Sequence, residues 1–216
     1  MDGRSLALRG RLACHCLLLE TRAGLVLVDT GFGTHDVHDP RERLSRFFLA
    51  LLAPDFRDNL TAIRQVERLG FQANDVRHIV LTHLDFDHAG GISDFPWASV
   101  HLMTQERAAA NAQASWLDRQ RYRPQQWAEH RHWHQYLVER GERWFGFDQV
   151  RDLHGLPPEI LLVPLEGHTL GHAGVAIRTG GGWLLQAGDA YFHHGEMDLQ
   201  RPHCTPGLRM YQWLME

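Results

Sequence analysis

The most informative stretch of the chain is Leu81-Thr82-His83-Leu84-Asp85-Phe86-Asp87-His88-Ala89-Gly90-Gly91. It continues the short apolar run His78-Ile79-Val80-Leu81, which is typical of a buried strand. Four side chains able to bind a metal ion fall within six residues directly after that strand: His83, Asp85, Asp87 and His88. Such a group is costly to desolvate unless a cation neutralises the carboxylates and uses the imidazoles. The stretch therefore predicts a metal site at the end of a strand rather than a solvated polar turn.

Two further strand ends carry matching groups. The apolar run 160–164 leads into Gly167-His168-Thr169, and the run 183–188 ends in Gly188-Asp189. A single histidine or aspartate beside a glycine is usually a turn residue. Ligands from three strand-end loops are what a rigid metal site needs, because strands fix position and loops supply polar groups. We therefore expect His168 and Asp189 to join the cluster, and His172 to form hydrogen bonds instead.

The rest of the chain reads as one α/β domain over residues 1–216. Runs 12–20 and 24–29 predict a β-hairpin, and further strands are expected at 78–81, 99–103, 160–164, 173–179 and 183–188. Helices are expected to begin at Pro40 and near Asn59, and a helical insertion at about 104–147, broken at Pro124. Within that insertion, His130 and His134 are expected on a solvated helical face.

Composition excludes several functional classes. The 216 residues, of 24.8 kDa, carry 22 basic and 26 acidic side chains, a formal net charge of −4. This balance argues against nucleic-acid binding, which requires excess positive charge. No apolar run approaches the roughly 20 residues of a membrane span. Three cysteines, two of them in Cys14-His15-Cys16, make no disulfide framework, which favours a cytoplasmic location.

The order of these motifs resembles the metallo-β-lactamase superfamily over nearly the whole chain. Asp29 in Val-Asp-Thr-Gly matches the first motif, whose aspartate orients the metal loop from outside the coordination sphere. The second motif, His-x-His-x-Asp-His, is matched by the 83–88 segment, the third by His168 and the fourth by Asp189. Within the superfamily the chain is most similar to the quorum-quenching N-acyl homoserine lactonase branch.

The resemblance implies a four-layer αββα sandwich and a dinuclear hydrolase with two divalent ions. His83, Asp85 and His168 would hold the first ion; Asp87, His88 and Asp189 would hold the second, with Asp189 shared. A metal-bridged hydroxide would attack a lactone or related ester, and Asp87 would also steer the nucleophile or carry a proton. Tyr191 would donate a hydrogen bond to the substrate, as a nearby tyrosine does in the lactonases. A homodimer is compatible with this family.

The sequence departs from the family pattern in two places. Asp85 stands where the family usually has a second histidine; a carboxylate is a harder ligand, so iron or manganese becomes more competitive with zinc, the expected metal. The family's last histidine ligand, from a strand near the C-terminus, has no counterpart after Asp189, because His193, His194 and His203 come too early. We expect a chain that stops before the last strand and helix of the sandwich.

The identity of the substrate stays open at this stage. The insertion is rich in aromatic residues, which either line an acyl-chain pocket or pack the insertion onto the sandwich: Trp116, Tyr122, Trp127, Trp133, Tyr136, Trp144 and Phe145. A thioester hydrolase of the glyoxalase II type is one alternative function. A non-catalytic, metal-stabilised binding module is the other, if the final ligand is truly absent.

Overall fold

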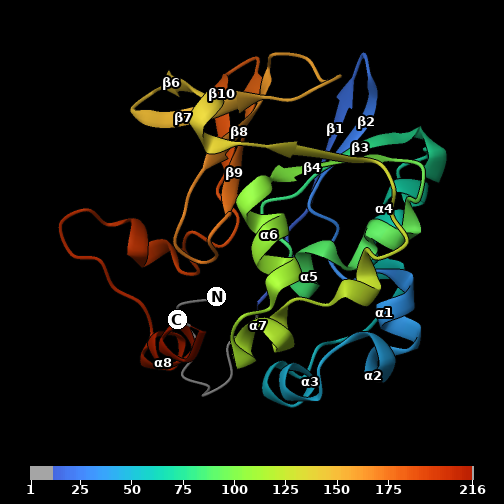
Figure 1. The fold of residues 1–216 in the computed structure, drawn as a ribbon, viewed down its shortest axis with the longest axis vertical. Helices are drawn as coiled ribbons and strands as arrows, with labels where there is room; N and C mark the ends of the chain where they lie inside the picture. Colours follow the sequence, from blue (N-terminus) through green and yellow to red (C-terminus); the bar gives the residue numbers. More distant parts are fainter. Residues whose placement is uncertain (1–11, 216) are drawn as a thin grey trace.

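Two five-stranded sheets form the centre of the computed structural model, which describes residues 12–215 (Figure 1). The first sheet has the order β1-β2-β3-β4-β5. Its β1–β2 hairpin is antiparallel, and the remaining neighbours pair in parallel. The strands are β1 (Leu17–Thr21), β2 (Gly24–Val28), β3 (Val76–Val80), β4 (Ser99–Met103) and β5 (Trp133–Tyr136).

The second sheet has the order β10-β9-β8-β7-β6 and is antiparallel throughout. Its strands are β6 (Glu142–Trp144), β7 (Phe147–Asp152), β8 (Ile160–Pro164), β9 (Ala173–Thr179) and β10 (Gly182–Gln186). The loops that follow β8 and β10 reach the same end of the sandwich as the loops that follow β2 and β3 (Figure 1).

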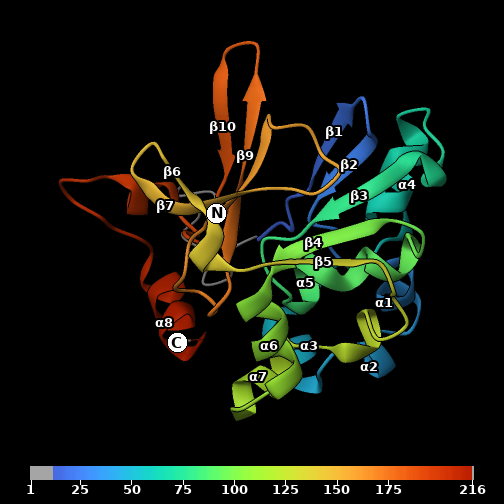
Figure 2. The same ribbon diagram turned by 45° about the horizontal axis from the view of Figure 1, so that its top comes forward.

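Helices α1 to α7 cover the face of the first sheet that points away from the second sheet (Figures 1 and 2). Helix α8, at the C-terminal end of the described chain, contributes Met215 to a buried cluster with Phe48 of α3 and Phe86 of α5. The helices are α1 (Thr34–His38), α2 (Pro40–Arg43), α3 (Arg46–Leu52), α4 (Ala62–Arg68), α5 (Phe86–Ala89), α6 (Thr104–Ala112), α7 (Trp116–Arg121) and α8 (Pro206–Met215). No helix within residues 12–215 has the length and apolar character needed to span a bilayer.

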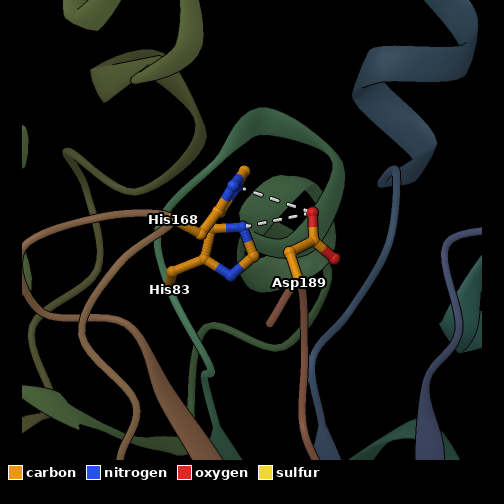
Figure 3. A group of neighbouring side chains, drawn as sticks. All are labelled: His83, His168 and Asp189. Carbon is orange, nitrogen blue, oxygen red and sulfur yellow. Dashed lines mark ion pairs between the residues drawn. The ribbon is translucent and has the colours of Figure 1, made fainter. Parts of the chain in front are cut away.

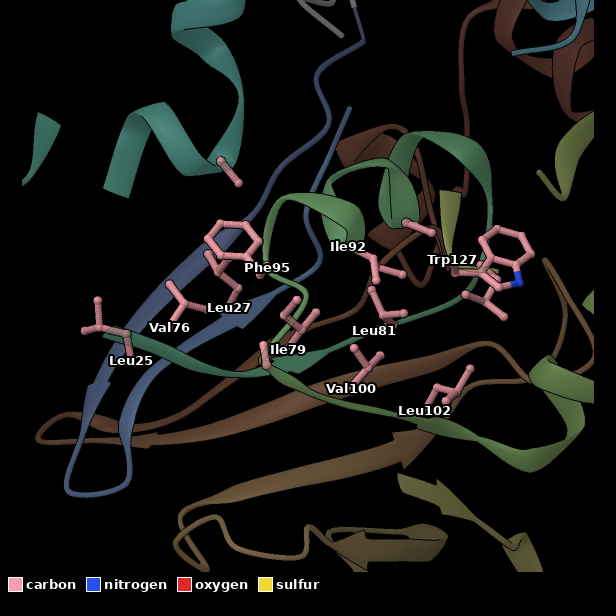
Figure 4. Packing of buried hydrophobic residues seen from close by; sticks show 14 of the residues in the cluster. Leu25, Leu27, Val76, Ile79, Leu81, Ile92, Phe95, Val100, Leu102 and Trp127 are labelled. Carbon is pink, nitrogen blue, oxygen red and sulfur yellow. The ribbon is translucent and has the colours of Figure 1, made fainter. Parts of the chain in front are cut away.

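The central strands are apolar on both faces because each face is covered. Leu25 and Leu27 of β2 belong to the core between the first sheet and the helices, drawn in Figure 4. Val26 and Val28 of the same strand point the other way, into the core between the two sheets. A strand buried on both sides reads as a continuous hydrophobic run. This arrangement confirms the α/β sandwich that the sequence predicts.

The predicted hairpin and the predicted strands are all present, but the insertion is helical only in its first part. Helices α6 and α7 end by Arg121, and the segment then supplies β5 to the first sheet and β6 to the second. His134 therefore lies on a strand, where its ring stacks on His101 of β4, and His130 is buried. The prediction of a helix through this region, with both histidines on a solvated face, is wrong. Its charged and aromatic residues carry no clear period, and pairing with β4 and β7 overrides their helical propensity.

Candidate metal centre

The candidate site gathers at the ends of β2, β3, β8 and β10. His83 and Asp85 lie in the loop after β3, and Asp85 precedes the first residue of α5. His168 lies in the loop after β8, and Asp189 follows β10. Ligand atoms of His83, His168 and Asp189 all lie within 4.8 Å of one another (Figure 3). The structure thus brings together three of the residues that the sequence assigned to metal binding, from three separate loops.

Two more of the predicted ligands border this group. Oδ2 of Asp85 lies 3.5 Å from Nε2 of His83 and 3.0 Å from Nε2 of His168. Nε2 of His88 lies 3.4 Å from Oδ1 of Asp189, whose Oδ2 lies 3.5 Å from Nε2 of His168. Asp189 therefore faces histidines on both sides. The sharing of Asp189 between two ions stays a prediction.

Asp87 lies in the first turn of α5, next to this cluster. The thiol of Cys14 is 3.8 Å from its Oδ2. Burial raises the pKa of Asp87 to about 6; His88 opposes this effect, and the negative charges of Asp189 and Asp85 add to it. The site therefore concentrates negative charge, which a cation would relieve.

Asp29 is hydrogen-bonded to the loop after β3. Its Oδ1 accepts a hydrogen bond from the backbone N–H of Thr82, at 2.8 Å. Its Oδ2 accepts from the Thr82 hydroxyl at 2.8 Å and from Nδ1 of His88 at 2.9 Å. Asp29 is buried and has a positive φ of 56°, which aspartate tolerates better than most residues.

The hydrogen bonds around His83 leave its Nε2 atom free to bind a metal. The Thr82 hydroxyl donates its proton to Asp29, so it accepts the contact of 2.9 Å from Nδ1 of His83. Nδ1 then carries the ring proton, and Nε2 carries a lone pair. Among the described residues, this buried Nε2 has no hydrogen-bond partner. Burial, with a smaller contribution from His88, lowers the pKa of His83 to about 3, so the ring is neutral, as a metal ligand must be.

This donor set fits a divalent ion. A buried nitrogen lone pair without a partner costs free energy unless something binds it. Donor atoms on a tetrahedral ion with bonds of about 2.1 Å lie about 3.4 Å apart. The Nε2 atoms of His83 and His168 lie 3.0 to 3.9 Å from carboxylate oxygens of Asp85 and Asp189.

Three residues that the sequence analysis did not single out also shape the site. Arg121, at the end of α7, binds Asp85 and His168. The carboxylate of Glu106 in α6 accepts hydrogen bonds from the backbone N–H of Leu84, the Thr169 hydroxyl and the N–H of Gly171. Tyr211 of α8 is close enough to the carboxylates that Asp87, Asp85 and Asp189 raise its pKa, after burial as the main cause. No spacing rule links these positions to the motif, because helix packing brings them there.

The remaining predicted residues have other positions. His172 donates from Nδ1 to the Leu165 carbonyl and accepts from the Asp189 N–H at Nε2, which confirms it as a hydrogen-bonding residue. Tyr191 is 41% exposed, and its predicted contact with substrate stays a prediction.

Of the insertion's aromatic residues, Trp127 is buried in the core and Trp144 packs on Trp183 of β10. Trp116 is 54% exposed and contacts Phe47 of α3. Packing thus explains most of this group.

Known proteins that are similar to this chain include probable metallo-hydrolases. Residues 9–100 match the family described as the metallo-beta-lactamase superfamily. Probable metallo-hydrolases of Mycobacterium bovis and Mycobacterium tuberculosis are each 48% identical over 190 residues, covering 87% of this chain. The chain spans only 59% of the length of each of these relatives. An N-acyl homoserine lactonase of Bacillus cereus is 31% identical over 102 residues, covering 47% of this chain and 41% of the relative.

Solved structures share the fold. One is an N-acyl homoserine lactone hydrolase with the product N-hexanoyl-L-homoserine bound at its catalytic metal centre. It superimposes with a TM-score of 0.65 at 24% identity, covering 92% of this chain and 74% of that one. With the two-sheet fold and the motif order described above, these findings show that the chain belongs to the metallo-beta-lactamase superfamily.

Proposed function

We propose that this chain is a metal-dependent hydrolase that opens a lactone or cleaves a related ester. The observation that carries the proposal is the buried, unpartnered Nε2 of His83, which faces the side chains of His168 and Asp189. Such a nitrogen among carboxylates and imidazoles is arranged for a cation. Two ions, with zinc as the first choice and iron or manganese as alternatives, would use the six predicted ligands His83, Asp85, Asp87, His88, His168 and Asp189.

The protein's own part in the reaction is to hold ligands in fixed orientations. When bound, divalent ions supply Lewis acidity and lower the pKa of water toward neutrality. Asp29 and Thr82 fix the tautomers of His88 and His83, so that both Nε2 atoms face the centre. Glu106 ties the loop after β3 to the loop after β8, which keeps His83 and His168 at a constant separation. Rigid ligands of this kind are a requirement for catalysis by preorganisation.

The ester class is supported by the relatives. Several of them are named as N-acyl homoserine lactonases, and one solved neighbour holds an opened lactone at its metal centre. We infer that Asp87, at the start of α5, exchanges a proton with the reacting group. The lactone proposal is preferred to the thioester alternative because relatives of this chain are named as lactonases.

A substrate panel tests the proposal. The zinc-loaded and the manganese-loaded protein would be incubated with N-acyl homoserine lactones, an aryl ester, a glutathione thioester and an aryl phosphodiester, and acid release would be followed. We expect turnover of lactone and ester, abolished by a chelator and restored by metal. Turnover of the thioester alone would move the assignment to the alternative enzyme class. Tight metal binding with no turnover of any substrate would favour a binding module.

A further inference from the structure

The guanidinium of Arg121 reaches from the end of α7 into the metal centre and contacts two of the predicted ligands. Its Nε donates to Oδ1 of Asp85 at 2.8 Å, and its Nη2 donates to Oδ2 at 2.6 Å. The same Nη2 lies 2.8 Å from Nε2 of His168, and Nη1 donates to the His168 backbone carbonyl at 3.2 Å. Arg121 is 4% exposed and Asp85 is 3% exposed, so these contacts form away from water and are strong.

The contact with Arg121 leaves Nε2 of His168 without a free lone pair. Arginine carries only donors, so a ring nitrogen 2.8 Å from Nη2 is hydrogen-bonded to it only as an acceptor. A neutral imidazole has one accepting nitrogen, and its lone pair cannot accept this proton and bind a metal ion at the same time. His168 differs in this respect from His83, whose buried Nε2 has no partner among the described residues.

Arg121 also explains why two acceptors lie so close together. Oδ2 of Asp85 and Nε2 of His168 are 3.0 Å apart. Both contact Nη2, which has two hydrogens and can donate one to each acceptor. A divalent ion bound by the same two atoms would also draw them together, because donor atoms on a tetrahedral ion lie about 3.4 Å apart. In this structure the guanidinium therefore neutralises Asp85 and bridges it to His168, as an ion would do.

Arg121 cannot make room for an ion by losing a proton. A lysine or a thiol can release a proton when a metal ion enters, but a guanidinium stays charged in proteins. An ion that binds both Asp85 and His168 must therefore move the Arg121 side chain away from Nε2. The positive charge that stays nearby also repels the ion, and a buried site screens this repulsion little. Both effects lower the affinity of the centre for metal.

We propose that Arg121 competes with divalent ions for the metal centre and occupies His168 and Asp85 until an ion displaces it. The proposal rests on the metal-dependent function proposed above and adds to it a step in the loading of the site. Zinc should bind the wild type more weakly than it binds a chain without a cation at position 121. Loading should also release the guanidinium from His168.

Zinc affinities of the full chain test the sign of the effect. Dissociation constants would be measured by competition with a chromophoric chelator for the wild type, Arg121→Met and Arg121→Gln. We expect both variants to bind zinc at least about tenfold more tightly, which corresponds to the lower limit for a hydrogen bond to a charged group. An unchanged or weaker affinity would overturn the proposal, since removal of a residue that only supports the ligands would weaken binding.

Arg119→Met is the matched control for the loss of an arginine from the same helix. Arg119 is exposed, and its Nη1 donates to the Gln113 carbonyl at 3.2 Å. The zinc affinity of this variant should equal that of the wild type. Binding as tight as that of Arg121→Met would assign the effect to overall charge and would contradict the proposal.

A second measurement needs no variant, so it does not depend on whether the Arg121 variants fold. The crystal structure of the zinc-loaded wild type would be determined. We expect zinc on Nε2 of His168, and Nη2 of Arg121 outside hydrogen-bond distance of that atom. Nη2 still bonded to Nε2 in the zinc-loaded protein would overturn the proposal.

Both readouts are independent of turnover. If no ester is cleaved but loss of Arg121 tightens zinc binding, the proposed function fails and this inference stands. If esters are cleaved and zinc binding weakens in Arg121→Met, this inference fails and the proposed function stands.

Discussion

Oδ2 of Asp29 lies 2.9 Å from Nδ1 of His88, across 59 residues of sequence. This contact joins the end of β2 to the last turn of α5 and fixes which nitrogen of His88 faces the centre. Burial lowers the pKa of His88, but the carboxylates of Asp189 and Asp29 raise it well above its usual value. Without metal, His88 is therefore held as a cation between two aspartates. A metal ion must displace that proton.

Replacing Asp29 by asparagine should weaken metal binding by about 10- to 100-fold. Asparagine keeps the left-handed backbone conformation that position 29 requires, so the change removes the charge with little strain. Zinc affinity by chelator competition measures the effect. An affinity within threefold of the wild type would show that hydrogen bonding without charge is enough at this position.

Replacing His168 by alanine should abolish both metal binding at the cluster and turnover. The variant removes one of the three donor side chains that meet within 4.8 Å. Because a ligand bound to the folded state stabilises it, zinc should raise the midpoint of thermal unfolding of the wild type. The rise should be absent or much smaller in His168→Ala. His132→Ala, at an exposed position, is the control that should behave like the wild type.

Replacing Asp87 by alanine should also remove metal and activity, because this residue is assigned both as a ligand and as a proton carrier. Elemental analysis of the purified variant and initial rates on the best lactone of the panel are the measurements. Full activity of Asp87→Ala would remove it from the catalytic centre. If Asp87→Ala kept its metal but lost activity, Asp87 would not be a metal ligand and would act only as a proton carrier.

Gly171→Ala should displace the loop that carries His168. A methyl group at this position would overlap the backbone nitrogen of Glu106 in α6, so the loop and the helix must separate. We expect a loss of several kcal/mol in the free energy of unfolding, or weaker metal binding, as overpacking and lost hydrogen bonds combine. Gly180→Ala is the matched control, since a Cβ there meets no atom within 4 Å. If both variants had the same free energy of unfolding and the same metal affinity, the close contact between Gly171 and Glu106 would not hold the His168 loop in place.

Acidification should destabilise the metal-free protein through histidines between the sheets. His101 is buried, with Nε2 at 3.0 Å from Nδ1 of His78 and Nδ1 at 2.8 Å from the Tyr136 hydroxyl. Burial lowers the pKa of His101 to about 3, and neighbouring histidines add to the shift. The unfolded chain, with an ordinary histidine pKa of about 6.5, binds more protons between these values. Stability is therefore full above pH 6.5 and falls as the pH drops, by up to about 1.4 kcal/mol per pH unit for this group.

Urea unfolding at pH 7 and pH 5 tests this prediction. His101→Gln should show a smaller fall in the free energy of unfolding between the two pH values than the wild type. His132→Gln, at an exposed position, should show the same fall as the wild type. If the free energy of unfolding of His101→Gln fell as much as that of the wild type, other titratable groups would be responsible for the pH dependence.

The sequence predicted the site residues that directly follow an apolar strand, because the topology of the sheets brings these strand ends together. His83, His168 and Asp189 each follow an apolar strand, and parallel or adjacent strands bring their ends together. Arg121 and Glu106 could not be found in this way, since their role depends on how α6 and α7 pack against α5 and on loops distant in sequence. The strand at 133–136 was missed for a related reason: pairing with β4 is a long-range interaction that local propensity does not contain.

The position of Arg121 and Glu106 has a consequence for protein engineering. Segments that connect the strands of a domain are often exchanged among homologues in order to graft a new specificity. Here residues 104–121 hold both strand-end loops of the centre, so a transplant of this region would carry part of the cation affinity with it. Variation in specificity and variation in metal content are therefore expected to be inherited together in proteins built like this one.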